Sequence, residues 1–478
     1  MGIFHGFRKT ILPPGGGIKS FLKPTLIRGR GVECSANIIK GAKSREMRVK
    51  VCDALCGAGK TSASINMMNA ELDKRFIFVT QYISETERIQ KACPGREFVL
   101  PSSDLGEGLT KLRDIHALLA AGENIATTHS LFVSFTDETK ELIKRQKYVL
   151  VLDEVVDVMC MSDIKKNDIN ILFKSQSIVE DEDGIKWIND EYDEVDGGKF
   201  REEMLRAKSK NLLKYDDEYF FWSIPAELFE CFTNVYVLTY MFDAQVLKYF
   251  FDMHNIEYEL IGTHRVKDGF EFCSIEEMDR ARDLRDKIHI LDHKKVNVIG
   301  DKRTALSFSW YRKAEAENGS APIEMLRKHL SNVFRNIFKT SGSDMIWSTF
   351  KDYRMPLSSK GLIEAFVSYN KRACNDYANR HYLAYCVNNF PRPWEVKYFR
   401  EHGVEVNCDM YALSILVQWI FRSAIRNGEE IWVYLPSARM RALLTQWLDN
   451  LAEGKDLEPV KYVAPRKSYY VSRNKNKK

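Results

Sequence analysis

The 478-residue sequence contains no uninterrupted apolar run near the length of a membrane span, so we expect no membrane contact. It contains no CxxC pair, and Cys52 and Cys56 are the only close pair among 10 scattered cysteines, which disfavours a zinc site. Scattered cysteines in a large chain are typical of a reducing compartment, so we expect a cytoplasmic location. No internal repeat is visible. A hydrophobic content of 45% and a charged content of 29% fit a globular protein of two or more domains.

Both ends of the chain are basic. Residues 1–46 are rich in glycine and lack the apolar core and cleavage site of a signal peptide, so we expect a flexible leader. Residues 461–478 form a basic tail that we expect to be mobile. From residue 301 onward there are 29 Lys and Arg against 18 Asp and Glu, and the first 300 residues hold 42 against 48. A basic second half indicates an anionic partner, although an acidic insertion and a basic tail would produce the same imbalance.

Short apolar runs alternate with helical patterns between residues 47 and 160, which predicts an α/β fold. Four of these runs, rich in Val or Ile and followed by polar residues, are predicted strands at 48–54, 75–81, 124–129 and 148–154. Continuous apolar strands separated by helices indicate a parallel sheet that is covered on both faces.

An acidic and polar stretch breaks this pattern, and we interpret residues 161–218 as an insertion in the first domain. A further strand is predicted at 234–242. A second α/β region then follows, with predicted strands at 270–275, 295–300, 364–369, 382–387 and 430–436.

The first predicted strand runs into a loop that fits the phosphate-binding pattern. Residues 54–61 read A-x-x-x-x-G-K-T, with an alanine in place of the first glycine. Glycines let the backbone curl so that successive N–H groups point toward phosphate oxygens, and the helix that follows offers its positive N-terminal end. The expected nucleotide-binding residues are Ala54, Gly57, Ala58, Gly59, Lys60, Thr61 and Ser62.

Two carboxylates complete this site. Lys60 can reach the β and γ phosphates, and the Thr61 hydroxyl can join the coordination shell of Mg2+. The predicted strand at 148–154 ends in Asp153 and Glu154, of which one can hold magnesium and the other can orient and deprotonate an attacking water. Alone, these carboxylates would equally suit an acidic helix cap. Together with the loop they predict an ATP site, with Thr61 and Asp153 as metal ligands.

With this loop followed by an apolar strand and Asp-Glu, the chain resembles the superfamily 2 helicases, the DEAD/DEAH-like group. More narrowly, it resembles the divergent helicase-like proteins of phages and other mobile elements. The resemblance covers roughly residues 47–450. It implies a P-loop NTPase fold of two tandem RecA-like domains with parallel sheets, at 47–265 and 266–460, and it implies ATP and Mg2+ as cofactors.

Further segments fall in the order that this resemblance requires. The ends of the predicted strands at 75–81 and 124–129 resemble segments that contact the nucleic-acid backbone in such enzymes. The stretch 366–377 resembles a segment of the phage-type relatives that could contact phosphate. Ordinary polarity at strand ends would give the same pattern. The nucleic-acid contacts implied are Thr80, Gln81, Thr128, His129, Asn370 and Arg372.

One segment resembles the element that couples hydrolysis to strand movement. Residues 236–242 correspond to the motif Ser/Thr-Ala-Thr, of which only Thr239 matches. The resemblance therefore implies a coupling role for Thr239, and the insertion accounts for its distance from the carboxylates along the chain.

A late segment resembles the final helicase motif, Q-x-x-G-R-x-x-R. Gln418, Arg422 and Arg426 lie four residues apart, so we expect all three on one helix face. An arginine that approaches across a domain cleft can stabilise charge developing on the γ phosphate. Because Phe421 replaces the glycine and Arg426 is one residue late, either arginine could act as this finger. A basic helix face packed on an acidic surface is the alternative.

The resemblance implies an ATP-dependent helicase or translocase that acts in DNA replication of a phage or mobile element. Its expected partners are single-stranded or partly duplex nucleic acid, with DNA favoured over RNA, and replication proteins. A packaging ATPase of the same fold is disfavoured because no carboxylate cluster of a nuclease follows residue 300. A nucleotide-gated replication loader that does not unwind remains open. Chain length and the second α/β region disfavour a metabolic kinase.

Overall fold

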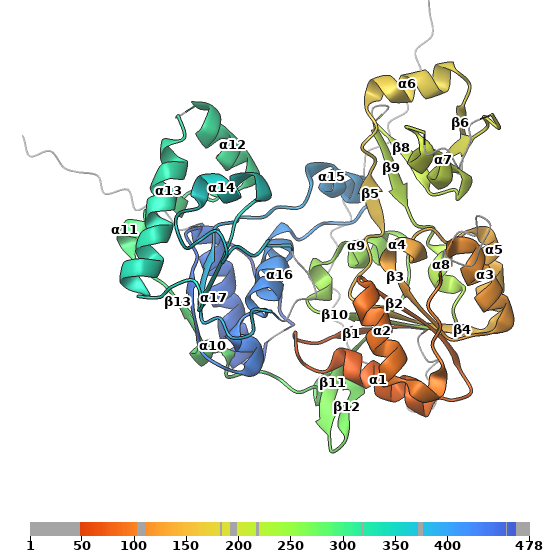
Figure 1. Ribbon diagram of the computed structural model, residues 1–478, viewed down its shortest axis with the longest axis horizontal. Helices are drawn as coiled ribbons and strands as arrows, with labels where there is room; N and C mark the ends of the chain where they lie inside the picture. Colours follow the sequence, from red (N-terminus) through yellow and green to blue (C-terminus); the bar gives the residue numbers. More distant parts are fainter. Residues whose placement is uncertain are drawn as a thin grey trace, which may run out of the picture. The chain divides into compact units, whose positions relative to one another are not determined.

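Two parallel sheets, each with a buried core, organise the chain (Figure 1). The computed structural model describes residues 48–102, 111–181, 184–191, 198–216, 219–317, 319–370, 376–455 and 457–464, all within one compact unit that spans 47–478. The predicted leader at 1–46 lies outside the described residues, as does most of the predicted tail at 461–478.

The first sheet has seven strands in the order β12-β11-β1-β10-β4-β2-β3. Its strands are β1 (Val49–Asp53), β2 (Arg75–Thr80), β3 (Ile125–Thr128), β4 (Tyr148–Asp153), β10 (Asn234–Thr239), β11 (Glu259–Val266) and β12 (Gly269–Ser274). All neighbours pair in parallel except β11 and β12, which form an antiparallel hairpin. The parallel sheet predicted from the apolar runs is confirmed.

Helices cover both faces of this sheet, which explains why its strands are apolar without alternation. They are α1 (Lys60–Ala70), α2 (Ile83–Ala92), α3 (Lys111–Ala121), α4 (His129–Phe132), α5 (Asp137–Gln146), α8 (Glu227–Glu230) and α9 (Val246–Met253). Successive side chains of one strand enter different cores: Ile77 packs with Ile115 of α3, and Phe78 packs with Met68 of α1. Both faces of each central strand are therefore buried.

The insertion predicted at 161–218 is a folded subdomain. Its elements are β5 (Met159–Met161), α6 (Lys166–Lys174), β6 (Ile178–Asp181), β7 (Gly184–Trp187), α7 (Arg201–Lys208), β8 (Leu212–Tyr215) and β9 (Tyr219–Ser223). β5 and β8 pair antiparallel with β9, so the two ends of the insertion are held side by side (Figure 1). Leu172, Ile185 and Phe220 belong to a small core of its own.

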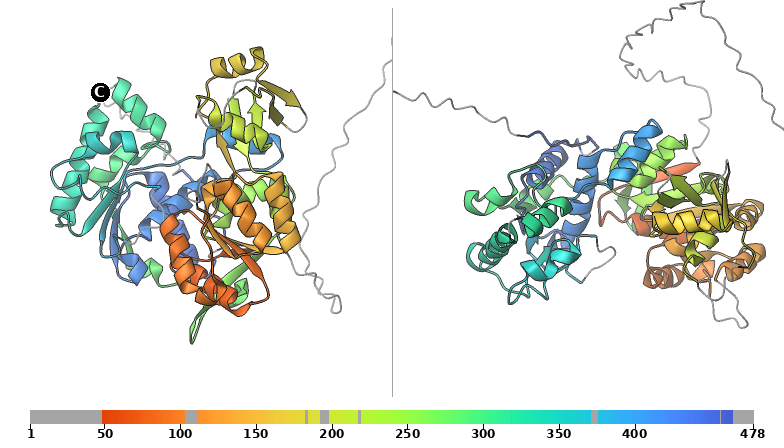
Figure 2. Two further views of the ribbon diagram at one scale, coloured as in Figure 1. Left: turned by 45° about the vertical axis from the view of Figure 1, so that its right-hand side comes forward. Right: turned by 90° about the horizontal axis from the view of Figure 1, so that it is seen from above.

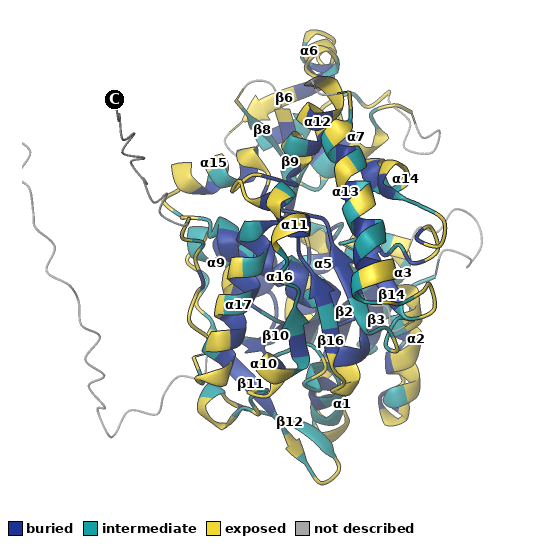
Figure 3. Cartoon of the chain, turned by 90° about the vertical axis from the view of Figure 1, so that its left-hand side faces the viewer, coloured by how far each residue is buried: buried dark blue, intermediate teal, exposed yellow. Residues whose placement is uncertain are grey.

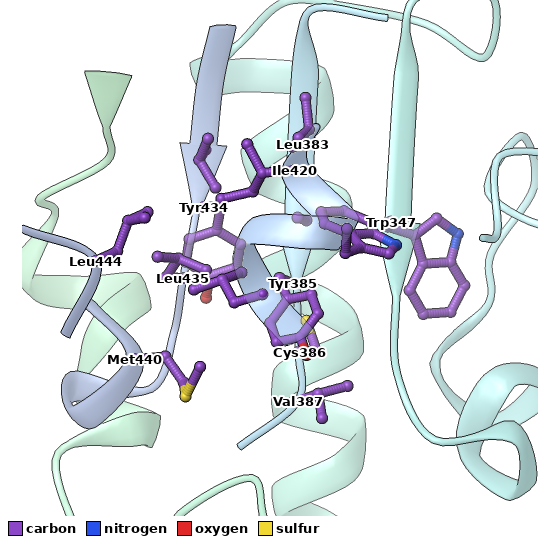
Figure 4. Packing of buried hydrophobic residues seen from close by; sticks show 14 of the residues in the cluster. Trp347, Leu383, Tyr385, Cys386, Val387, Ile420, Tyr434, Leu435, Met440 and Leu444 are labelled. Carbon is purple, nitrogen blue, oxygen red and sulfur yellow. The ribbon is translucent and has the colours of Figure 1, made fainter. Parts of the chain in front are cut away.

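The second sheet has four parallel strands in the order β13-β16-β15-β14. Its strands are β13 (Ile288–Ile290), β14 (Met345–Ser348), β15 (Tyr382–Tyr385) and β16 (Ile431–Tyr434). Its helices are α10 (Leu284–Lys287), α11 (Lys294–Asn297), α12 (Phe308–Glu317), α13 (Ala321–Asn332), α14 (Arg354–Leu357), α15 (Pro393–Glu401), α16 (Cys408–Ile420) and α17 (Ala438–Ala452). Aromatic and aliphatic side chains such as Trp347, Tyr385 and Tyr434 fill its core around α16 (Figure 4). α16 is buried along most of its length (Figure 3).

Two strand predictions for the second region are wrong, and a third predicted strand belongs to the first sheet. The run at 270–275 forms β12, which pairs with β11, so the first sheet extends past the boundary predicted at 265. The run at 295–300 lies in α11 and a 3-10 turn, because a short apolar run does not distinguish a buried helix from a strand. The run at 364–369 touches the second sheet only through one isolated bridge, between Trp347 and Phe366.

α15 belongs to the second region in sequence but packs on the first domain and its insertion. Phe399 is fully buried in the core of the first domain. The Tyr398 ring lies 5.0 Å from the Phe221 ring of β9, and the Tyr215 hydroxyl donates to Glu401 over 2.8 Å. Figures 1 and 2 show this helix beside the insertion, away from the other helices of the second sheet. The chain thus crosses back to the first domain between β15 and α16.

Candidate active site

The loop after β1 has the conformation that its glycines allow. Gly57 and Gly59 have φ of 86° and 77°, in the left-handed region that side chains disfavour, and α1 begins at the next residue. A Cβ atom at Gly59 would lie 2.2 Å from the Phe270 ring of β12. The Thr263 hydroxyl of β11 donates to the Ala58 carbonyl oxygen over 2.6 Å. The β11–β12 hairpin therefore packs against the loop and supports it, a role that the sequence analysis missed.

Lys60 extends back across the loop. Its Nζ atom donates to the carbonyl oxygens of Ala54 and Leu55 over 2.6 and 3.0 Å. Ser62 follows in the first turn of α1 and is half-buried. The Lys60 ammonium and the positive N-terminal end of α1 together concentrate positive charge at the point where the strand, loop and helix meet.

Thr61 and Asp153 meet although they lie far apart in the sequence. The Thr61 hydroxyl donates to Asp153 Oδ1 over 3.0 Å. Burial and, second, the neighbouring Glu154 carboxylate raise the pKa of Asp153 from 3.8 to about 6, whereas the Thr61 hydrogen bond lowers it. A cation beside this carboxyl group would lower its pKa and so offset the effect of burial. The paired hydroxyl and carboxylate oxygens are the ligands that Mg2+ prefers.

Glu154 leaves the end of β4 in a strained conformation. Its φ of 71° is uncommon for a residue with a side chain, and its N–H donates to the Leu238 carbonyl oxygen of β10 over 3.0 Å. This turn places Glu154 in the wall of the same cavity that Lys60 and Thr61 line. Strain of this kind is typical of functional positions.

Three more strand-end residues line this cavity, namely Thr80, Gln81 and Thr239. The Gln81 side-chain oxygen is buried and accepts no hydrogen bond within the described part of the chain. The Thr239 carbonyl oxygen accepts from the Ala54 N–H over 3.2 Å, which ties β10 to the loop. Thr80 and Gln81, predicted as nucleic-acid contacts, thus lie in the cavity of Lys60.

The other predicted nucleic-acid contacts are dispersed. Thr128 ends β3 and His129 begins α4; the Thr128 hydroxyl lies 3.1 Å from that of Ser130. Asn370 lines a second cavity. Arg372 lies outside the described residues.

The second domain contributes to the wall of the first cavity through Gln418, Phe421, Arg422 and Arg426. The expectation of one continuous helix face is wrong, because α16 ends at Ile420. Arg422 follows the helix, and Arg426 lies in a 3-10 turn, yet both reach the cavity. Arg422 is 6% exposed, whereas Arg426 is on the surface.

Two charged lining residues were missed by the sequence analysis. Glu85 and Arg88, on the first turns of α2, both line the cavity and form an ion pair of 2.6 Å. Their i,i+3 spacing directly after Thr80 and Gln81 was the available indication.

Over the described ranges, no helix is long and apolar enough to cross a membrane.

The glycine loop on a parallel sheet, the facing carboxylates and the second parallel sheet define a P-loop fold of two RecA-like domains. The chain belongs to the YonV family. It is 40% identical over 416 residues to the SPbeta prophage-derived uncharacterized protein YonV of Bacillus subtilis (strain 168), which covers 84% of this chain and 99% of that protein. The family model of the YonV C-terminal Rossmann-like domain matches residues 282–448, a range that begins after β12.

Among solved structures, S. tokodaii Xpd4 matches at 12% identity and a TM-score of 0.38, over 84% of this chain and 94% of that one.

Proposed function

We propose that this protein is an ATP-dependent translocase of nucleic acid that acts as a helicase in the replication of a phage or mobile-element genome. One observation carries the proposal. Lys60, Thr61 and the pair Asp153–Glu154 share a single cavity with Arg422 of the other domain. That arrangement suits phosphoryl transfer, in which positioning and charge stabilisation supply most of the catalysis.

The residues of the cavity fit ATP and Mg2+. Gly57 and Gly59 supply the curled backbone for phosphate oxygens, and Lys60 supplies a cation beside them. Thr61 and Asp153 would hold the metal, since their oxygens already lie 3.0 Å apart. When bound, Mg-ATP supplies the phosphoryl group and part of the charge neutralisation.

The remaining groups have roles that follow from their positions. Glu154, beside the metal carboxylate, orients water and accepts its proton. Arg422 or Arg426 donates hydrogen bonds to the charge that develops on the transferred group, and Gln418 lines the same cavity from the last turn of α16. Because these side chains come from two domains, closure of the domains assembles the site and excludes water.

β10 connects this site to the second domain. Its end contacts the phosphate loop through Thr239 and the Glu154 turn through Leu238. The next residue, Tyr240, accepts a hydrogen bond at its hydroxyl from the Trp447 ring N–H of α17 over 3.0 Å. These contacts support the coupling role proposed for Thr239, because a shift of α17 would move the end of β10 and, with it, both the phosphate loop and the Glu154 turn.

The prophage origin of the Bacillus subtilis relative supports a role in a mobile genome. The surplus of basic residues after position 301 suits nucleic acid, held largely through its backbone, so binding should weaken as salt rises. A replication loader or a packaging ATPase would also bind ATP and DNA, but would not separate strands.

The test is ATP hydrolysis with and without single-stranded DNA or RNA, in the wild type, Lys60→Ala and Glu154→Gln. We expect one polymer to stimulate hydrolysis, and both variants to lose about 100-fold or more of it. Glu154→Gln should still bind ATP, since its loop is intact. A strand-displacement assay then separates the helicase from the loader. Hydrolysis that is slow and indifferent to both polymers would overturn the proposal.

A further inference from the structure

A second cavity adjoins the first and shares a wall with it. Val155, Gln418 and Arg422 line both cavities. The rest of the second cavity comes from segments far apart in the sequence: the stretch after β4, the start of α9, the loop at 369–370, the stretch before α15, and α16. An occupant would therefore touch both domains and two of the residues that we assign to nucleotide hydrolysis.

The lining of this cavity is rich in aromatic rings and amides. Its rings are those of Tyr369, Phe390 and Tyr411, and its amides include Asn370, Asn389 and Gln418. Flat rings offer stacking surfaces to any base, and amides offer a donor beside an acceptor for base edges. The Gln418 side chain makes no hydrogen bond with any residue that the structure describes, so its amide remains available to a ligand.

Two of these rings are fixed before any ligand arrives. The guanidinium group of Arg439 lies 4.2 Å from the centre of the Phe390 ring, and Arg439 is itself fully buried and bonded to Asp409 over 2.8 Å. The Tyr369 ring packs on Phe350 at 5.4 Å. Rings held in place lose little freedom on binding, which favours a binding role over a loosely packed surface.

The charges of this cavity do not suit phosphate. Arg392 pairs with Glu395 over 3.5 Å, and Glu395 is 10% exposed at its side chain. Asp157 adds a second carboxylate to the wall, and Arg422 adds a second cation. The two acidic groups balance the two basic ones, whereas the first cavity has the Lys60 ammonium inside a glycine loop. The second cavity therefore fits an uncharged aromatic group better than an anion.

We propose that the second cavity binds a base of the single strand on which the protein acts. This inference rests on the proposed function and adds to it a grip on the base, beside the backbone contacts. Through Gln418 and Arg422, an occupied cavity favours the arrangement of side chains that hydrolyses ATP. An empty cavity leaves these two residues without that support.

The test compares oligo-dT with an abasic strand of the same length, which keeps the phosphates and lacks the bases. We expect the wild type to bind oligo-dT roughly fivefold to a hundredfold more tightly, the range that stacking supplies. Oligo-dT should also stimulate hydrolysis more than the abasic strand does. Tyr369→Ala and Asn389→Ala should each reduce this preference without changing the affinity for the abasic strand.

Two matched variants serve as controls. Tyr369→Phe keeps the ring and should keep the preference, and Tyr219→Ala, at an exposed position of the insertion, should do the same. Thermal unfolding verifies that each variant is folded. An equal affinity of the wild type for both strands would overturn the inference while leaving the motor intact. The absence of binding and stimulation by either strand would instead mark failure of the proposed function.

Discussion

The carboxyl ends of the two parallel sheets differ in chemistry. Five parallel strands of the first sheet end in polar residues, Asp53, Thr80, Thr128, Asp153 and Thr239. In the second sheet, β15 and β16 end at tyrosines that are fully buried, Tyr385 and Tyr434. The polar groups that the second domain brings to the cavity come instead from the end of α16 and the turn after it.

This difference separates a sheet that carries the proposed catalytic groups from a sheet that supports them. The first sheet holds its functional groups directly on strand ends, where hydrogen bonds between neighbouring strands fix them. The core of the second sheet holds α16 in place. This packing positions Arg422, just after the helix, in the wall of a cavity that the first domain also lines. α15 is an exception to this division, because it follows β15 of the second sheet in the chain but packs in the core of the first domain.

Replacing each of the two cavity arginines by alanine tests this comparison of the two sheets most strongly. Arg422→Ala should lower kcat about 1000-fold or more, because a buried arginine in the cavity wall can act as the finger. Arg426→Ala should cost clearly less, since that side chain is on the surface. Steady-state hydrolysis at saturating ATP measures both. Equal losses, or a larger loss for Arg426→Ala, would assign the finger to the surface arginine.

Shortening the Phe399 side chain of α15 tests whether this helix stabilises the first domain. Phe399→Ala should lower the free energy of unfolding by about 3–5 kcal/mol, the usual cost of deleting a buried ring. Phe308→Ala makes the same change at a position that is 43% exposed, and should cost far less. Hydrogen exchange should then show lost protection in the first sheet. Lost protection confined to the second sheet would contradict the assignment of α15 to the first domain.

The smallest effect concerns Asp53, a strand end that does not line the first cavity. Burial raises the pKa of Asp53 from 3.8 to about 6, against the lowering effect of the hydrogen bond from the Phe242 N–H. A raised carboxyl pKa contributes stability below about pH 4, and this is lost as pH rises through 6. Relative to Asp53→Asn, the wild type should lose about 1–2 kcal/mol between pH 5 and pH 7.5.

Urea unfolding across that pH range measures the difference between the two proteins. Asp73→Asn, at an exposed position of the first domain, is the control and should track the wild type. A difference between Asp53→Asn and the wild type that stays constant with pH would show that Asp53 is ionised without penalty.

The sequence predicted the first domain better than the second. In the first, the runs at 48–54 and 148–154 are apolar on both faces and end in glycines or carboxylates, and such runs have few alternatives. In the second, the run at 295–300 became a helix, and β13 and β14 were missed. Strands this short carry too little periodicity to be distinguished from turns of buried helix.

The site follows the same division. Lys60, Thr61, Asp153 and Glu154 were found from motif and spacing, and the structure brings all four to one cavity. The hairpin that braces Gly59 through Phe270 left no such pattern, because the contact joins residues that are distant in the chain and ordinary in type.

The sequence by itself determined the phosphate loop and the carboxylates that face it, since glycine conformation and strand-end polarity are local properties of the backbone. Only the tertiary structure decided that Arg422 enters this cavity from beyond the end of α16, and that Phe399 completes the core of the other domain. Such contacts depend on how distant buried surfaces fit together, and no short stretch of sequence contains that information.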